Sequence, residues 1–570
     1  MKKHALVLIG LGLGGCAQLT PPPQPQSVDP VEAHVQHDNT ALHLSAPVMF
    51  EIMLAEMLVQ RGEVTQAHAL LFELAQKKRE VALMERVFEL AMASYSVERI
   101  KQTVTLWGEL EPTAPTPWRV GYLMALREGA LDEALALWMR YREYSPLSLE
   151  DDLKNAASQA LQGTAAETGL AFFEQLSQRY PQTWAAGYAY GYAADQYGQP
   201  ELAVSVLETV VARNDAPAEA YFALANLYVE HNLYARGLVQ LNAYVREHPE
   251  AWSIQERYAR MEVKGGYYTE AMARYQRIVE ANSQAYTSKL SLALLQLETG
   301  QEAQAKLLLS ELVAIKGYED VSHYYLGLIE QGQGATDKAM AHLLEVRHMS
   351  YFVDARLLIA QIIYDRHGLD AALASLDELE LALDEQRVKV LRAKALLSVQ
   401  AAQSEQAISF YRQALAIDAQ PQISYALAML LYEQGDMLGF EQVLSAALVE
   451  HPDEPDLLNA LGYLYVEQNR QLDQAAAYLD RALALAPDSY YILDSRAWLA
   501  YRQGDLALAE SLIKRAWSMY QDETVLVHMI QIKWALGKRA RAEALWQTYH
   551  AQFKSSAELQ NLLERLRQNP

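Results

Sequence analysis

Residues 198–211 read GQPELAVSVLETVV, and this stretch decides the fold. Ala203 stands four residues before Leu207 and seven before Val210, so the three apolar side chains share one face of a helix. Gly198, five residues before the alanine, suits the left-handed residue at which a preceding helix ends and the chain reverses. The stretch therefore predicts the second helix of a helical hairpin.

The same pattern recurs along the chain with a mean spacing of about 34 residues. A small residue lets two antiparallel helices approach closely, and a large residue one turn later fills the space toward the next pair. Of fifteen small-residue positions, eleven are alanine and two are glycine. This first column is Ala67, Thr103, Ala134, Gly169, Ala203, Gly237, Ala271, Ala305, Ala339, Ala372, Ala407, Phe440, Ala475, Ala509 and Ala542. The second column, four residues further on, is Leu71, Trp107, Trp138, Phe173, Leu207, Leu241, Tyr275, Leu309, Leu343, Leu376, Tyr411, Leu444, Leu479, Ile513 and Trp546.

Glycines and prolines mark where the helices end. Nine glycines stand five residues before the first column, and five prolines close second helices because proline cannot continue a helix. Spacings of 36 and 31 residues around Thr103, and one extra residue near Arg470, predict irregular geometry at those two places. The glycines are Gly62, Gly129, Gly198, Gly266, Gly300, Gly334, Gly435, Gly504 and Gly537, and the prolines are Pro146, Pro181, Pro249, Pro452 and Pro487.

Residues 47–553 resemble the tetratricopeptide-repeat family through these columns. The resemblance implies an all-α fold, a right-handed superhelical solenoid of about 15 helical hairpins in which each first helix lines an inner groove. After the repeats, Ser555-Ser556-Ala557-Glu558 reads as a capping box. We expect residues 554–570 to form a C-terminal capping helix that seals the last repeat. Its apolar face is made of Leu559, Leu562, Leu563 and Leu566.

The composition excludes several classes of function. With 570 residues, 51% of them hydrophobic and 21% charged, the chain is too apolar to be disordered. Its formal net charge of −23 would repel phosphate backbones, which argues against nucleic-acid binding. One cysteine excludes both an internal disulfide framework and a cysteine-rich zinc site.

The sequence also gives no sign of catalysis. It contains no His-Glu-x-x-His metal helix and no Gly-x-Ser-x-Gly elbow. The histidines are scattered, and His342 and His348, six residues apart, do not share a helix face. The acidic run at 377–385 reads as a solvated helix face and turn. We therefore predict no enzymatic activity, no metal and no cofactor.

The first 46 residues predict a lipoprotein. Lys2 and Lys3 precede an apolar stretch at 5–13 that is too short to span a bilayer, and small residues lead to Cys16. This order resembles the lipobox of bacterial lipoproteins, which implies that residues 1–15 are a signal peptide and that Cys16 receives palmitate-type acyl chains. The alternative is a lone buried cysteine beside an unrelated signal peptide.

The residues after the lipobox predict the location. Ala17 stands where the lipoprotein family's inner-membrane retention signal is Asp, so the resemblance implies a lipid anchor in the outer membrane and a body that faces the periplasm. Residues 16–46 combine the lipidated cysteine with a tether rich in proline and glutamine.

The groove positions of the repeat family fall on aromatic and polar residues. Rigid aromatics with a few polar groups suit an extended peptide or a partner helix, and the alternative is that they pack between repeats. The basic group at 257–264 could hold a carboxylate or a C-terminal tail, or could neutralise Glu256 and Glu262. The candidate positions are Tyr188, Tyr192, Phe222, Asn226, Arg257, Arg260, Lys264, Tyr324, Tyr425, Asn459, Tyr463, Asp494, Trp498 and Tyr501.

The last third carries a sharper likeness. The stretches at 459–463, 492–504 and 534–539 resemble a proteobacterial family of large tetratricopeptide outer-membrane lipoproteins, the LbcA-type adaptors, although that family usually has glycine at the position of Ala497. A member of that family binds and activates a periplasmic carboxyl-terminal processing protease and helps deliver cell-wall hydrolases to it. The resemblance implies a non-catalytic scaffold that tethers protease and substrate. The alternative is a scaffold for envelope assembly or secretion, pilotin-like or for polysaccharide export.

Overall fold

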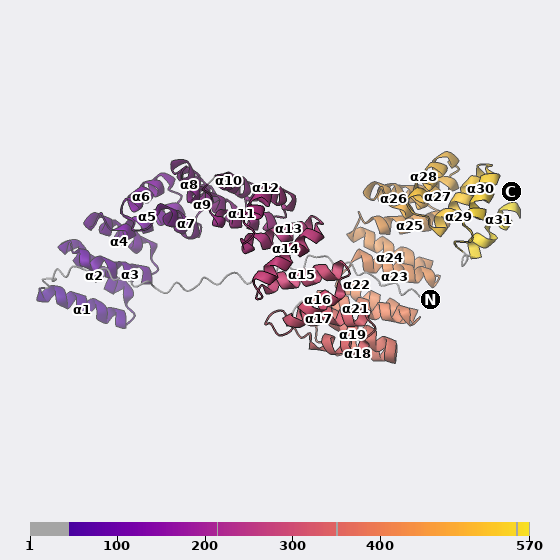
Figure 1. The fold of residues 1–570 in the computed structure, drawn as a ribbon, viewed down its shortest axis with the longest axis horizontal. Helices are drawn as coiled ribbons and strands as arrows, with labels where there is room; N and C mark the ends of the chain where they lie inside the picture. Colours follow the sequence, from indigo (N-terminus) through magenta and orange to yellow (C-terminus); the bar gives the residue numbers. More distant parts are fainter. Residues whose placement is uncertain (1–44, 214, 349–350, 554–556, 569–570) are drawn as a thin grey trace. The chain divides into compact units, whose positions relative to one another are not determined.

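The computed structural model describes residues 45–213, 215–348, 351–553 and 557–568. Within these ranges the regular elements are thirty-one α-helices and one 3₁₀ helix, and no strand occurs (Figure 1). Cys16, the predicted signal peptide, the tether up to residue 44 and the capping residues Ser555 and Ser556 lie outside the described residues. None of the described helices is long and apolar enough to cross a membrane.

The helices form two compact units that divide between Ile254 and Gln255. Unit 1 contains α1 (Ala46–Gln60), α2 (Val64–Lys78), the 3₁₀ helix (Val81–Leu83), α3 (Met84–Ala93), α4 (Val97–Leu110), α5 (Pro115–Arg127), α6 (Leu131–Tyr144), α7 (Leu149–Ala160), α8 (Ala166–Arg179), α9 (Trp184–Gln196), α10 (Pro200–Val211), α11 (Ala218–Glu230) and α12 (Tyr234–Glu247). The first turn of α13 (Trp252–Lys264) contains the boundary.

Unit 2 continues with α14 (Tyr268–Ala281), α15 (Tyr286–Glu298), α16 (Glu302–Leu312), α17 (Glu319–Gly332), α18 (Thr336–Glu345), α19 (Phe352–His367), α20 (Leu369–Asp377), α21 (Asp384–Gln400), α22 (Ser404–Ile417), α23 (Pro421–Glu433), α24 (Met437–Glu450), α25 (Pro455–Glu467), α26 (Leu472–Leu485), α27 (Tyr490–Arg502), α28 (Leu506–Met519), α29 (Glu523–Ala535), α30 (Arg539–Tyr549) and α31 (Ala557–Gln568). Most odd-numbered helices pack against the helix that follows them, as predicted, for example α5 on α6, α21 on α22 and α27 on α28, whereas α7 packs mainly on α9.

The two sequence columns make the core of these hairpins. All fifteen residues of the first column are buried. The second column is buried at every position except Trp546, which is half-buried and donates its indole N–H to the backbone oxygen of Leu559 at 2.9 Å. Gly462 on α25 shows how close the helices come, because a Cβ atom built there would lie 2.8 Å from Leu479 Cγ on α26. The predicted packing logic is confirmed.

The turns also follow the prediction. All nine predicted glycines have left-handed backbones, with φ between 71° and 85°. Asn232 and Ala402 take the same place in their hairpins, with φ of 58° and 54°. The departure near Arg470 contains two left-handed residues, Asn469 and Gln471, which absorb the extra residue. The wide spacing before Thr103 accommodates the 3₁₀ helix.

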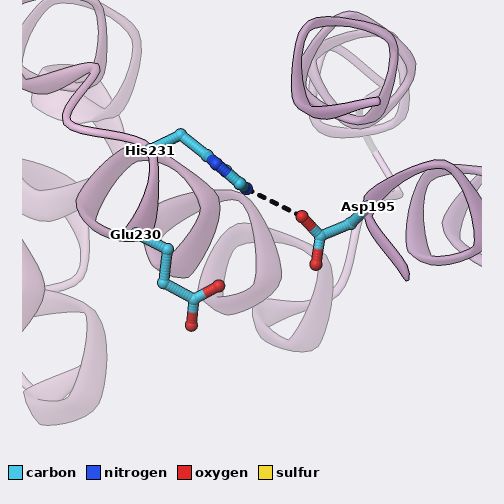
Figure 2. A group of neighbouring side chains, drawn as sticks. All are labelled: Asp195, Glu230 and His231. Carbon is cyan, nitrogen blue, oxygen red and sulfur yellow. Dashed lines mark hydrogen bonds and ion pairs between the residues drawn. The ribbon is translucent and has the colours of Figure 1, made fainter. Parts of the chain in front are cut away.

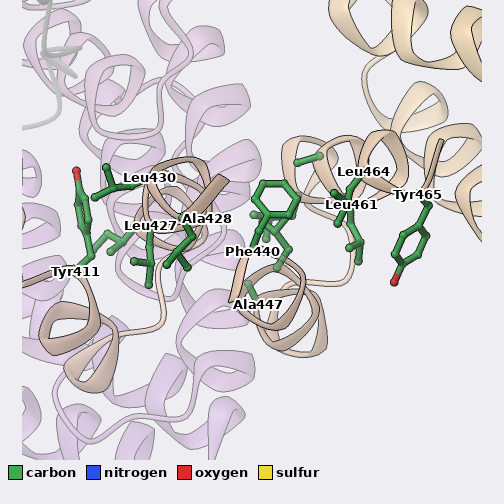
Figure 3. Packing of buried hydrophobic residues seen from close by; sticks show 14 of the residues in the cluster. Tyr411, Leu427, Ala428, Leu430, Phe440, Ala447, Leu461, Leu464 and Tyr465 are labelled. Atoms are coloured by element: carbon green, nitrogen blue, oxygen red, sulfur yellow. The ribbon is translucent and has the colours of Figure 1, made fainter. Parts of the chain in front are cut away.

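Within each unit, apolar clusters run from hairpin to hairpin and hold the helices together. In unit 2 one cluster extends from Val388 on α21 to Leu499 on α27, and Figure 3 shows its middle part. In unit 1 the Trp138 ring on α6 lies with its centroid 5.3 Å from Tyr122 on α5 and 6.1 Å from Phe172 on α8, so large aromatic rings from three helices fill the core. Each hairpin therefore covers an apolar face of its neighbour.

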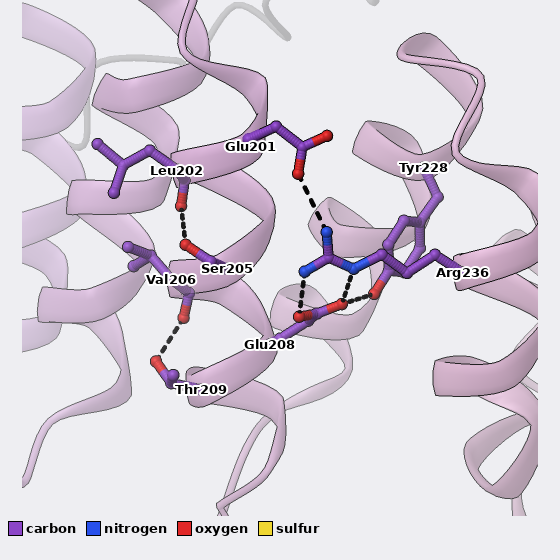
Figure 4. Close-up of polar contacts among 8 residues, drawn as sticks. All are labelled: Glu201, Leu202, Ser205, Val206, Glu208, Thr209, Tyr228 and Arg236. Carbon is purple, nitrogen blue, oxygen red and sulfur yellow. Dashed lines mark hydrogen bonds and ion pairs between the residues drawn. The ribbon is translucent and has the colours of Figure 1, made fainter.

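Charged clamps join neighbouring hairpins at the edge of these cores. Glu208 on α10 accepts hydrogen bonds from Arg236 Nε and Nη2 on α12, both at 2.7 Å, and from the Tyr228 hydroxyl on α11 at 2.6 Å (Figure 4). The Arg236 guanidinium lowers the pKa of Glu208. The same residue types recur in unit 2, where Arg470 and Tyr465 both donate to Glu441. The clamp fixes one hairpin against the next.

The two ends of the described chain differ. At the C-terminal end, α31 buries Leu559, Leu562 and Leu563 in a cluster with Trp534, which confirms the predicted capping helix. At the other end, α1 packs on α2 but leaves Phe50 65% exposed.

Candidate functional site

Two predicted groove residues of unit 1 form an aromatic pair on α9. The rings of Tyr188 and Tyr192 stack with centroids 6.4 Å apart, and Trp184 meets the Tyr188 ring edge-on at 5.6 Å. Tyr188 is half-buried, which raises its pKa, whereas Tyr192 is exposed. The pair therefore offers one accessible aromatic face. Phe222 and Asn226 on α11 are half-buried.

The basic residues of α13 differ in their surroundings. Arg257 lies 3.9 Å from Glu256, and Lys264 is exposed. Glu262 is bound by Arg274 on α14, whose Nε and Nη2 donate to the carboxylate at 2.9 and 2.8 Å. Arg260 is half-buried.

Two further predicted positions lie apart in unit 2. Tyr324 on α17 is buried, and its ring centroid is 5.0 Å from that of Tyr351, so it belongs to the packing between hairpins. Tyr425 on α23 is exposed. Burial and then the charge of Asp456 raise the pKa of Tyr425, and the Tyr491 hydroxyl donates to Asp456 at 2.7 Å, so α23, α25 and α27 present a shared polar edge.

The predicted residues that meet most closely lie on α25 and α27. Trp498 stacks on Tyr501 with centroids 4.7 Å apart, and its indole N–H donates to Glu467 at 2.8 Å. On its other side Trp498 stacks on His528 of α29 at 4.1 Å. Asp494, only 4% exposed, forms hydrogen bonds of 2.9 and 3.0 Å with His528 Nδ1. The buried carboxylate of Asp494 and the buried imidazole of His528 therefore support the aromatic stack.

Tyr463 extends this stack onto α25. Its ring centroid lies 6.3 Å from that of His528, and burial, followed by the charge of Glu467, raises its pKa. We call Tyr463, Trp498, Tyr501 and His528 the C-terminal aromatic row. Sequence reasoning missed His528, which stands 34 residues after Asp494, the same spacing as the repeat.

Two amide oxygens on α25 and α29 lack partners within the described part of the chain. Asn459 Oδ1 on α25 and Gln531 Oε1 on α29 are both shielded from solvent and accept no hydrogen bond there. Such an acceptor is costly unless a donor reaches it.

Unit 1 also brings together three potential metal ligands that the sequence did not suggest. His231 Nε2 lies 2.8 Å from Asp195 Oδ1, and one donor atom of each of Asp195, Glu230 and His231 lies within 4.8 Å of the others (Figure 2). Asp195 comes from the end of α9, and the other two residues from the end of α11. The hydrogen bond between Asp195 and His231 joins neighbouring first helices.

Comparison with known proteins bears out the repeat assignment. A family model described as "Tetratricopeptide repeat" matches residues 222–286, 392–455 and 459–522. The chain is similar to TPR repeat-containing protein PA4667 of Pseudomonas aeruginosa, with 26% identity over 536 residues, 93% of this chain and 90% of the relative.

Among solved structures, yeast Tom70 covers 91% of this chain at 14% identity and a TM-score of 0.32, with 96% of that chain matched. The pilF protein of Pseudomonas aeruginosa covers 37% of this chain at 19% identity and a TM-score of 0.31, with 97% of that chain matched. The family model, the buried columns and the succession of described helices agree with one another over the matched residues. The residues that the family model matches, 222–286, 392–455 and 459–522, are tetratricopeptide repeats.

Proposed function

We propose that this chain is a non-catalytic scaffold that binds an extended segment of a partner protein along α25, α27 and α29. The observation that carries the proposal is the C-terminal aromatic row, in which Tyr463 and Tyr501 are half-buried and keep part of their rings accessible, while Trp498 and His528 beside them are buried. Aromatic rings contribute apolar contact at low entropic cost.

We further propose that the partner is a periplasmic carboxyl-terminal processing protease and that cell-wall hydrolases are its substrates. In this role the protein is anchored to the outer membrane through Cys16 and holds protease and substrate together, which raises their effective concentration. The sequence likeness to the LbcA-type adaptors and the lipobox support this proposal.

Reconstitution tests it. The mature protein alone should leave a cell-wall hydrolase intact, and its addition to the protease should speed degradation. Tyr501→Ala should weaken partner binding by about 2 kcal/mol, or roughly 30-fold, if the row is the centre of the interface. Tyr95→Ala is the control, because Tyr95 is almost fully exposed in the turn after α3 of unit 1. Equal degradation rates with and without the protein would contradict the adaptor role.

A second experiment separates the adaptor from an assembly scaffold. Crosslinking in intact cells should trap a serine protease if the protein is an adaptor, whereas secretin or export-channel subunits would support the alternative. Arg257→Glu combined with Arg260→Glu should weaken a partner that uses the basic residues of α13. Unchanged binding in calorimetry would assign those cations a structural role.

A further inference from the structure

Two histidines face each other inside the hairpin of α17 and α18. His323 Nδ1 and His342 Nδ1 are 3.1 Å apart, and the ring centroids are 5.3 Å apart. The residues are 19 positions apart and come from different helices, so the hairpin packing brings them together. Both side chains are half-buried.

The distance between the two nitrogens fits a shared metal ion. Zinc binds imidazole nitrogen at about 2.0–2.1 Å. Two nitrogens 3.1 Å apart at that bond length subtend an angle of about 100° at the metal, between the square-planar and tetrahedral values. Without a metal, one Nδ1–H donates to the other Nδ1, and the arrangement is an ordinary hydrogen bond.

The surroundings favour neutral imidazoles and a cation. Burial is the main cause that lowers the pKa of both rings, and the charge of His323 lowers that of His342 further, so both keep a lone pair for coordination near neutral pH. The carboxylates of Glu345, Asp320 and Glu319 act on His323, and Glu330 acts on His342 against the opposing charge of Lys306.

We infer that His323 and His342 form a chelating site for a transition-metal ion of the Zn²⁺, Ni²⁺ or Cu²⁺ class. Among the described residues no third His, Cys, Asp or Glu donor joins the pair within 4.8 Å, so water completes the coordination. Two imidazoles make a site that follows the Irving–Williams order, with Cu²⁺ bound more tightly than Zn²⁺. The bound ion would crosslink α17 to α18.

The site is tested by titrating the full chain with ZnCl₂ in a calorimeter at pH 7.5. His323→Gln and His342→Gln should each lower the affinity of one Zn²⁺ at least tenfold. His348→Gln, a few residues beyond α18, is the matched control and should bind as the wild type does. His342→Cys should keep the site, because a thiolate also ligates Zn²⁺, and this rescue separates lost coordination from lost folding.

The group of Asp195, Glu230 and His231 is the competing site for the ion. If His231→Gln removes the Zn²⁺ that the wild type binds, while His323→Gln and His342→Gln do not, the ion belongs to the group of Asp195 and Glu230 and the inference is wrong. Wild-type affinity in both variants of the pair, or failure of His342→Cys to bind while its circular dichroism is native, would also overturn it.

Discussion

The close approach of helices at Gly462 gives a prediction whose size can be worked out. In Gly462→Ala, the new Cβ would lie 2.8 Å from Leu479 Cγ and 3.0 Å from Leu479 Cδ2, and Leu479 is fully buried. Such overpacking costs about 1–3 kcal/mol. The control is Gly332→Ala on α17, where a Cβ meets nothing within 4 Å and the better helix preference of alanine should stabilise by up to about 1 kcal/mol.

Hydrogen exchange measured by mass spectrometry is the suitable assay, because a repeat array opens locally and has no single unfolding free energy. Peptides from α25 and α26 should exchange about 5- to 150-fold faster in Gly462→Ala, which corresponds to a loss of 1–3 kcal/mol. Peptides from α17 should exchange more slowly in Gly332→Ala. Unchanged or slower exchange in α25 would refute the packing argument.

A double mutant sharpens the test. Leu479→Ala alone leaves a cavity and should cost about 2–5 kcal/mol. Combined with Gly462→Ala, the added methyl group no longer collides with the leucine, so the double variant should be about 1–3 kcal/mol more stable than the sum of the single effects. Additivity within about 0.5 kcal/mol would show that the two positions do not press on each other.

Three further predictions concern the turns, the charges and the cap. Ala402→Gly should slow local exchange and stabilise by up to about 1 kcal/mol, because an alanine with φ of 54° is strained where a glycine is not. Lys533 and Lys538 lower the pKa of Glu510 from its ordinary 4.5 to about 2, so its contribution to stability is present above pH 4.5 and is lost as the pH falls toward 2. Thermal unfolding at pH 6 and pH 3 should show this loss, and Glu510→Gln should reduce the difference. Leu562→Ala should speed exchange in α31 and α29 before other helices, because that leucine is buried in the terminal cluster.

Much of the fold could be predicted because the same local sequence pattern recurs in each repeat and has the same structural effect each time. Ala203 and Gly198 specify a close contact and a chain reversal from local sequence alone, and the same residue types do so at each following hairpin. The sequence indicated where the irregular turn near Arg470 lies but not its backbone conformation, because two left-handed residues, Asn469 and Gln471, share the adjustment.

The site was harder to predict because its contacts join different hairpins. The register indicates which residues of a first helix lie on one face, but it does not say which side chain of the next hairpin meets them. His528 bonds Asp494 at a separation of 34 residues, and His68 bonds Thr103 at a separation of 35. A search for polar pairs separated by about one repeat could therefore have found the support beneath the C-terminal aromatic row.

The unequal ends of the described chain determine where such an array can be lengthened. A designed hairpin fused ahead of Ala46 could pack on the apolar side of α1, where Phe50 and Met53 are more than half exposed. A hairpin added after Gln568 would first have to displace α31 and its buried leucines. Engineering of longer variants should therefore proceed from the amino-terminal side.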